Sequence, residues 1–233
     1  MKILVINPNS TVSMTRKIAK CATESVAEGT VVHTVNPPST PTSIEGYYDA
    51  AMSESGVLDE LRKGEIARYD GYVIACFDDV GIDSCRELAT GPVMGICEAG
   101  LHAASVLAPR FTIMTTLPRV TAHIEDLVFR YGFNRKCVNV RAVDIPVLDL
   151  ERCGNARHKI RDAIKQSIKE DHAEAVILGC AGMTDLVSWL ESETQVPIID
   201  GVRAGVCMVE ALVRAGLRTS KACTYAEPRV KPQ

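Results

Sequence analysis

The sequence predicts an α/β protein built from two similar lobes, each with a parallel sheet. Short apolar runs rich in Val and Ile alternate with longer helical patterns along the whole chain. The order of these runs repeats once, and each copy holds an apolar run that ends in a cysteine, Cys76 in the first and Cys180 in the second. We therefore expect lobes related by a pseudo-two-fold axis, with a ligand cleft between them.

The first half of the chain contains four predicted strands, over residues 3–6, 30–35, 72–76 and 92–95. Helices are predicted over about 12–28, 46–68, 80–89 and 97–108. We expect the second of them to be interrupted near Ser55 and Gly56, because glycine disfavours a helix interior. Residues 36–43 hold three prolines with Ser and Thr, which is typical of a loop.

The second half repeats this order, with predicted strands over residues 110–116, 137–142, 175–180 and 196–200. Helices are expected over about 118–131, 155–172 and 182–193, and a last one ends near residue 215. Residues 144–149 should form a loop, and the tail at 218–233 should be mostly irregular. We assign residues 1–95 and 205–233 to the lobe that carries Cys76, and residues 96–204 to the lobe that carries Cys180.

The composition is that of an ordinary globular protein. Of 233 residues, 46% are hydrophobic and 24% are charged, which is enough to bury a sizeable core. The net charge is −3 and the basic residues are scattered, so we expect neither nucleic acid nor a membrane surface as a partner. The N-terminal apolar run is too short for a signal peptide, and no run approaches the roughly 20 residues of a membrane span. We expect a cytoplasmic protein.

The nine cysteines do not follow a disulfide or zinc pattern. Their number is odd, no pair has C-x-x-C spacing, and the five histidines do not cluster with them at ligand spacing. We therefore expect no metal site. Most of these cysteines should be small buried hydrophobic residues or surface thiols.

Five polar residues are expected where predicted strands end, at the sheet edge that binds ligands in open α/β folds. They are Asn9, Cys76, Thr115, Thr116 and Cys180. If one thiolate removes a proton from a carbon acid and the opposite thiol returns a proton to the other face, the result is racemisation or epimerisation. A free thiol has a pKa of about 8.5, so one member of a pair can be ionised while the other is protonated.

The surroundings of the two thiols in the sequence suggest how a thiolate would be stabilised. Each cysteine precedes a helical pattern, whose backbone N–H groups and dipole favour an anion. No lysine or arginine lies within five positions of either, so local backbone donors should carry this role unless a distant residue folds into place. The alternative is that both are buried packing residues, but their matched positions in the repeat favour a functional pair.

Three neighbouring segments each allow two interpretations. Residues 7–11, Asn-Pro-Asn-Ser-Thr, can form a turn with a Ser/Thr helix cap, or can present Asn9 and Ser10 to a polar substrate. Residues 179–182 lack side-chain bulk, so backbone can approach a ligand or simply turn tightly. Asp78 and Asp79 can orient Cys76, although adjacent acids before a helix are usually caps. There is no phosphate-binding glycine motif.

The motifs together resemble those of a known family. The chain is similar to the hydantoin and allantoin racemases, within the cofactor-independent aspartate/glutamate racemase superfamily. The matching segments span nearly the whole chain and are ILVINPNST from residue 3, SIEG from 43, GYVIACFDD from 71, GPVMGICEA from 91, FTIMTT from 111, LGCAGM from 178 and VPIIDG from 196. The family pattern often has Gly-Asp or Asp-Pro-Gly after the first Cys-Phe, whereas this chain has Asp78, Asp79, Val80 and Gly81.

The resemblance implies two flavodoxin-like lobes with the active site between them, and Cys76 and Cys180 as the two acid/base residues. It also implies a homo-oligomer and a set of substrate contacts. These contacts are Asn9, Ser43, Phe77, Thr115, Thr116 and the backbone around Ala181 and Gly182.

The expected reaction is inversion at C5 of a 5-monosubstituted hydantoin or of allantoin, with a cyclic ureide as substrate and no cofactor. Three alternatives remain open from the sequence. They are a racemase for a free amino acid or an open-chain ureido amino acid, a decarboxylase or cis-trans isomerase of the same fold, and a two-lobed binding protein without catalysis.

Overall fold

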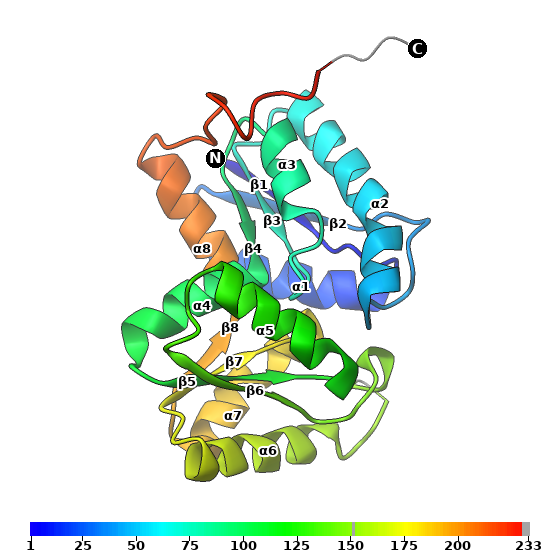
Figure 1. The fold of residues 1–233 in the computed structure, drawn as a ribbon. Helices are drawn as coiled ribbons and strands as arrows, with labels where there is room; N and C mark the ends of the chain where they lie inside the picture. The colour runs from blue at the N-terminus through cyan, green and yellow to red at the C-terminus, as the bar shows by residue number, and fades with distance from the viewer. Residues whose placement is uncertain (151, 230–233) are drawn as a thin grey trace.

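Two lobes, each built on a four-stranded parallel sheet, make up the protein (Figure 1). The computed structural model describes residues 1–150 and 152–229. The first sheet has the order β2-β1-β3-β4 and the second the order β6-β5-β7-β8. The strands are β1 (Lys2–Ile6), β2 (Val31–Val35), β3 (Gly71–Ile74), β4 (Val93–Gly95), β5 (Phe111–Thr115), β6 (Cys137–Ala142), β7 (Ala175–Leu178) and β8 (Ile198–Asp200). The equivalent strand orders confirm the predicted fold class.

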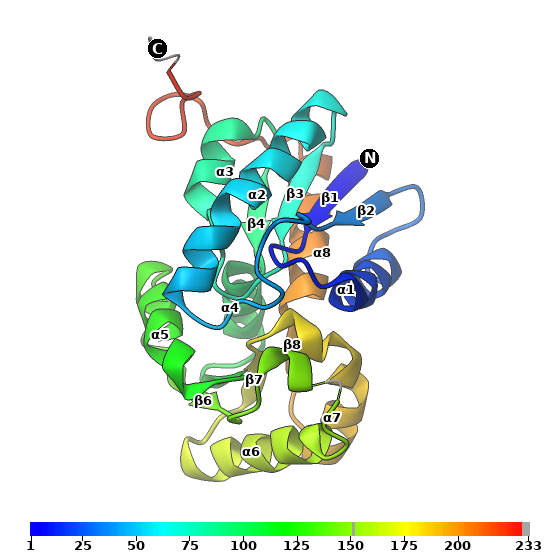
Figure 2. The same cartoon turned by 90° about the vertical axis from the view of Figure 1, so that its right-hand side faces the viewer.

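Helices cover both faces of each sheet (Figure 2). On the faces that look toward the other lobe lie α1 (Val12–Glu24), α4 (Ile96–Leu107), α5 (Thr121–Arg130) and α8 (Gly201–Arg214). The outer faces carry α2 (Tyr47–Ile66) and α3 (Ile82–Leu88) in the first lobe, and α6 (Ala156–Glu170) and α7 (Val187–Thr194) in the second. Three short 3₁₀ helices are η1 (Pro118–Val120), η2 (Val147–Asp149) and η3 (Ala181–Leu186).

Alternation along the strands divides the apolar residues among three cores. In β1, Ile3 and Val5 point into a central core, whereas Leu4 and Ile6 point under α2 and α3. In β7, Ile177 likewise belongs to the central core and its neighbours belong to the outer core under α6 and α7. The central core contains residues of both sheets, so the lobes are joined by continuous apolar packing. Such two-sided burial explains why these strands read as uninterrupted apolar runs.

The structure corrects the predicted break in α2, which runs through Ser55 and Gly56 without interruption. A Cβ atom added at Gly56 would lie 2.7 Å from Thr40 and 2.8 Å from Pro37. The glycine therefore allows the loop at residues 36–43 to approach the helix closely, and it does not break the helix.

The ends of several elements also differ from the predictions. The strand β3 ends at Ile74 and β7 at Leu178, so each cysteine lies in the turn after its strand and not on the last strand position. The predicted helices at 118–131 and 182–193 both begin as 3₁₀ turns, and the predicted loop at 144–149 contains η2. The helix α1 ends at Glu24, four residues before its predicted end near residue 28. The direct strand-to-helix turns at the sheet edge account for the tight 3₁₀ starts.

The tail contains neither helix nor strand between residues 217 and 229, as predicted, while residues 230–233 lie outside the described residues. The Thr219 hydroxyl donates to the carbonyl of Gly91, and Lys221 donates to the carbonyls of Arg86 and Glu87. These bonds hold the tail against the first lobe. The proposed lobe boundaries fall at the start of α4 and in the first turn of α8, and they stay a prediction.

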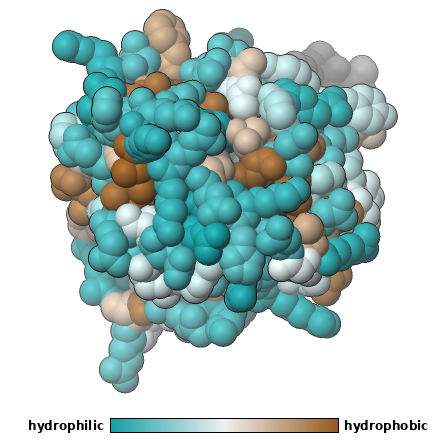
Figure 3. Space-filling view, turned by 90° about the horizontal axis from the view of Figure 1, so that it is seen from below, coloured by the Kyte–Doolittle hydropathy of each residue, from teal (hydrophilic) through white to brown (hydrophobic). Residues whose placement is uncertain are grey.

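The outer surface of the second lobe, seen from below, is mostly hydrophilic, with apolar patches separated by polar side chains (Figure 3). Within residues 1–150 and 152–229, no helix is both long and apolar enough to span a membrane.

Candidate active site

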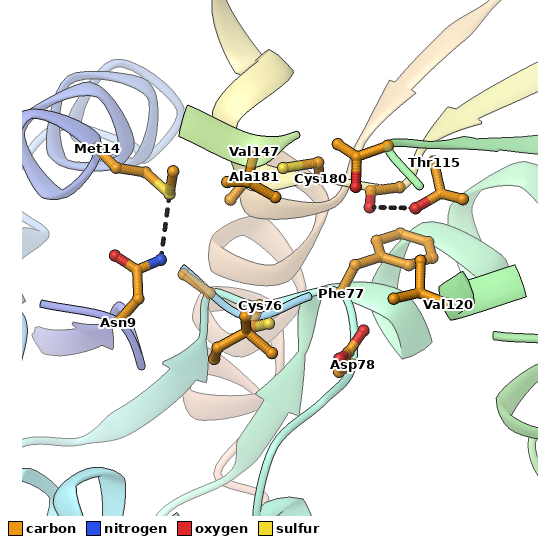
Figure 4. Close-up of a pocket in the computed structure, with 14 residues that line it drawn as sticks. Asn9, Met14, Cys76, Phe77, Asp78, Thr115, Val120, Val147, Cys180 and Ala181 are labelled. Atoms are coloured by element: carbon orange, nitrogen blue, oxygen red, sulfur yellow. Dashed lines mark hydrogen bonds between the residues drawn. The ribbon is translucent and has the colours of Figure 1, made fainter. Parts of the chain in front are cut away.

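A cavity lies where strands of both lobes end, and both cysteines face it (Figure 4). Its empty volume is about 420 Å³, including the part open to solvent. Fourteen of the described residues line it, namely Asn9, Met14, Ile44, Ala75, Cys76, Phe77, Asp78, Thr115, Thr116, Val120, Val147, Gly179, Cys180 and Ala181. Seven of the nine predicted site residues are among them. Ser43 is not, although its neighbour Ile44 is, and Gly182 is not, although its backbone contacts Cys180.

The two thiols sit in different kinds of turn. Cys180 occupies the N-cap position of η3, and its sulfur accepts a hydrogen bond from the backbone N–H of Gly182 at 3.4 Å. Cys76 begins a turn in which the N–H of Asp79 donates to its carbonyl at 3.0 Å, and the backbone N–H of Asp78 approaches the thiol. The predicted backbone donors are therefore present at both sulfur atoms.

Burial nevertheless outweighs these donors in its effect on the thiol pKa values. Burial raises the pKa of Cys180 to about 11, and the Gly182 N–H lowers that pKa only partly. The pKa of Cys76 is also raised well above its usual range, by burial first and by the charge of Asp78 second. The Cys180 sulfur contributes as well, so the two thiols are close enough for the ionisation of one to oppose that of the other. Both thiols are therefore harder to ionise than the usual thiol pKa led us to expect.

Asn9 is held by its neighbours so that its amide N–H faces the cavity. Its Oδ1 accepts from the side chain of Asn7 and from the backbone N–H of Thr11. Its Nδ2 has only the sulfur of Met14, at 3.3 Å, and sulfur is a weak acceptor. Thr11 occupies the N-cap position of α1, as predicted, but its side chain makes no cap bond, because its hydroxyl donates to the carbonyl of Thr42. Asn9 therefore has a donor available for a ligand.

The hydroxyls of the second lobe come from the end of β5. The Thr115 hydroxyl donates to the carbonyl of Gly179 at 3.3 Å and so ties β5 to the turn that carries Cys180. The Thr116 backbone carbonyl accepts from the N–H of Ile145, which fixes the residue at the cavity wall. Both threonines are buried to 5% exposure or less. The Thr115 hydroxyl therefore has a partner within the protein, and both threonines line the cavity.

A model of the Asp/Glu/Hydantoin racemase family matches residues 3–209, which is most of the chain. The chain belongs to this family. It is 50% identical to the hydantoin racemase of Rhizobium meliloti over 99% of this chain and 96% of that protein.

Two solved structures of this family share the whole fold of the chain. The allantoin racemase from Klebsiella pneumoniae superposes with a TM-score of 0.97 at 44% identity, covering 100% of this chain and 96% of that one. The allantoin racemase from Pseudomonas fluorescens has a TM-score of 0.95 at 36% identity, covering 100% and 99%. The protein is thus a racemase, and hence an isomerase, as its sequence predicted.

Asp78 and Asp79, which follow Cys76 closely in the sequence, lie in different environments in the racemase. The Asp79 carboxylate accepts from the backbone N–H groups of Cys97 and Glu98 at 3.0 Å each, and from the Tyr131 hydroxyl at 2.8 Å. Asp79 thus caps α4 and not α3, the helix that follows it in the sequence. The residue has a left-handed backbone (φ 47°), and a Cβ at Gly95 would lie 2.2 Å from its carboxylate, so the close approach requires glycine. Asp78 instead turns toward the cavity.

Sequence reasoning missed Lys17, which reaches the second lobe from α1. Its ammonium donates to the carbonyl of Gly182 at 3.2 Å and pairs with Asp185 at 3.2 Å. Its charge lowers the pKa of Cys180. The helical period could have indicated this position, because Lys17 lies one turn from the buried Met14 and next to the buried Ile18 in α1.

The described residues contain no group of three or more His, Cys, Asp and Glu side chains placed to hold a metal ion. The described residues that line the cavity instead offer two thiols, two hydroxyls, an amide and one carboxylate, beside apolar side chains.

Proposed function

We propose that this racemase inverts C5 of a 5-monosubstituted hydantoin or of allantoin, by proton transfer between Cys76 and Cys180 and without a cofactor. The observation that carries the proposal is that the two lobes each contribute one thiol to a single cavity. The activity named for the relatives, hydantoin racemase and allantoin racemase, supports this choice of substrate.

The chemistry of the ring suits a pair of thiols. The C5 hydrogen lies beside a carbonyl, so its removal gives an enolate whose charge is spread onto oxygen. One thiolate takes the proton from one face, and the opposite thiol delivers a proton to the other face. The product enantiomer leaves with the ionisation states of the two sulfur atoms exchanged. Hydrogen-bond donors aimed at the enolate oxygen lower the barrier to this step.

The polar groups of the cavity match a neutral ring better than an ionised amino acid. The Asn9 amide and the Thr116 hydroxyl offer hydrogen bonds to ring carbonyl and N–H groups. No lysine, arginine or histidine is among the fourteen lining residues, so an amino-acid carboxylate would find no cationic side chain there. Apolar side chains such as Ile44, Val120 and Val147 complete the wall and suit a substituent on the ring.

The test is polarimetry with single enantiomers of 5-substituted hydantoins and of allantoin, in buffer that contains a metal chelator. Wild-type protein should bring each enantiomer to zero rotation. Cys76→Ser and Cys180→Ser should each abolish racemisation, because an alkoxide is inaccessible near neutral pH. The exposed Cys223 provides the matched control, and Cys223→Ser should racemise normally.

Solvent exchange separates the roles of the two thiols. In deuterated solvent, each Ser variant should exchange the C5 hydrogen of one enantiomer at most, because only one base remains. Normal turnover by either Ser variant would contradict the two-thiol mechanism. Equal exchange of both enantiomers by both variants would contradict the assignment of one thiol to each face.

A further inference from the structure

Asp78 is the only formally charged side chain among the described residues that line the cavity. It lies two residues after Cys76 and points into the space near Phe77 and Val120 (Figure 4). Asp78, Cys76 and Cys180 line the same cavity, and the negative charge of Asp78 opposes the ionisation of both thiols. A charge in this position faces whatever occupies the cavity.

The Asp78 carboxylate has no hydrogen-bond donor from the described residues. Its neighbour Asp79 accepts three hydrogen bonds, whereas no side chain or backbone group donates to the oxygens of Asp78. The charges that act on it are His123 on α5, which favours its ionised form, and Asp49 on α2, which opposes it. A partly exposed carboxylate that receives no hydrogen bond from the described residues is an open acceptor for an N–H donor on a ligand.

We propose that Asp78 is a specificity-determining residue that accepts an N–H hydrogen bond from a neutral ureide and excludes substrates bearing a carboxylate. This inference rests on the proposed function, because it concerns which compounds the same site accepts. The N–H donor belongs either to the hydantoin ring or to a ureido substituent at C5, as in allantoin. Both sources present the same chemistry to the carboxylate.

The exclusion of anions follows from the balance of charge around the site. A substrate carboxylate would lie near Asp78, and none of the described residues that line the cavity carries a cationic side chain to offset the repulsion. Lys17 is not among the lining residues, and its ammonium contacts the carbonyl of Gly182 and the carboxylate of Asp185. Burial raises the pKa of Asp78 to about 6, so at pH 8 the carboxyl is ionised and the repulsion is fully present.

The charge is tested with Asp78→Asn, which keeps the shape and an oxygen acceptor. Racemisation of 5-isopropylhydantoin and of hydantoin-5-acetic acid, one neutral and one anionic, is followed by polarimetry at pH 8. We expect wild-type protein to prefer the neutral compound, and Asp78→Asn to raise the kcat/KM ratio of anionic to neutral substrate at least tenfold. The ratio cancels any common effect of the variant on the thiols. Asp126→Asn, which removes an exposed acid of α5, should leave the ratio unchanged.

The acceptor is tested with Asp78→Ala on allantoin and 5-isopropylhydantoin. If the ureido substituent donates, the Ala variant loses at least tenfold in kcat/KM on allantoin alone. If the ring N–H donates, it loses on both compounds, and Asp78→Asn restores most of the loss. In either case the acceptor role is supported.

Three results would overturn the inference. They are equal use of the anionic and neutral hydantoins by wild-type protein, an unchanged substrate ratio in Asp78→Asn, and unchanged kcat/KM on both neutral compounds in Asp78→Ala. Failure of the proposed function looks different, because wild-type protein would then racemise none of the hydantoins.

Discussion

Removing the charge of Lys17 should make the Cys180 thiol harder to ionise. Lys17 donates to the carbonyl of Gly182 at 3.2 Å, and the N–H of the same residue donates to the Cys180 sulfur at 3.4 Å. The ammonium lowers the pKa of Cys180, which burial has raised to about 11. Only 20% of the Lys17 side chain is exposed, so solvent screens this interaction weakly.

The magnitude follows from Coulomb's law. Two unit charges about 7 Å apart in a medium of effective dielectric constant ~20 attract by about 2 kcal/mol. The Asp185 carboxylate, 3.2 Å from the ammonium, offsets part of this attraction. We therefore expect Lys17→Met to reduce the thiolate fraction of Cys180 about tenfold at any pH well below its pKa, equivalent to about 1.4 kcal/mol. Because a more basic thiolate is also a better base, the fall in kcat/KM should be about threefold to tenfold.

The assay has two independent readouts. Alkylation of Cys180 by iodoacetamide, measured by peptide mass spectrometry between pH 7 and 9, should slow about threefold to tenfold in Lys17→Met. The kcat/KM for racemisation should fall in parallel, and Lys17→Arg, which keeps the charge, should restore both. Lys20→Met, on the exposed face of α1, is the matched control. An unchanged or faster alkylation of Cys180 in Lys17→Met would refute the electrostatic role of Lys17.

Three further predictions concern the fold and its response to pH. Asp79→Ala should lower the free energy of unfolding by about 3 kcal/mol, because it leaves buried N–H donors unpaired. Tyr131→Phe, which removes only one hydrogen bond to Asp79, should lower it by about 1 kcal/mol. Urea denaturation measures both values, and equal losses would contradict the capping role of Asp79. Burial raises the pKa of Asp79 from 3.8 to about 7, so its protonated form is favoured by folding and its contribution to stability is lost as pH rises through that range. Asp79→Asn should therefore show a flatter dependence of unfolding free energy on pH between 4 and 7 than wild-type protein, and an identical slope would refute this. Ile177→Ala in the central core should lower the free energy of unfolding by about 3 kcal/mol, whereas Val106→Ala on the surface should lower it by less than about 0.5 kcal/mol.

The fold was predictable because its signal is local and repeated. Residues 72–74 and 175–178 are fully buried strands, and such strands read as continuous apolar runs whatever their distant neighbours are. The repeated order of elements then implied two equivalent sheets, and Cys76 and Cys180 followed as residues at equivalent strand ends. Their acid/base roles stay a prediction, whereas their convergence on one cavity is an observation.

The predictions failed where a residue's role depends on contacts across the fold. Gly56 suggested a broken helix, but the loop at residues 36–43 packs against it and needs the absence of a side chain. Asp79 suggested a cap for the helix that follows it, but its carboxylate reaches the N–H groups of α4. Neither partner is adjacent in sequence, so no local pattern identifies it.

The sequence by itself determined the α/β class, the duplicated architecture and the two thiols at matching positions. Hydrophobic periodicity and the residue types at strand ends can both be read from residues that are neighbours in the sequence. Only the tertiary structure decided how those thiols are solvated and which charges face them. Burial raises the pKa of both, Lys17 approaches Cys180 from the other lobe, and Asp78 faces the cavity without a donor. Desolvation and Coulomb interactions depend on distances through space, and these distances exist only once the two lobes have packed together.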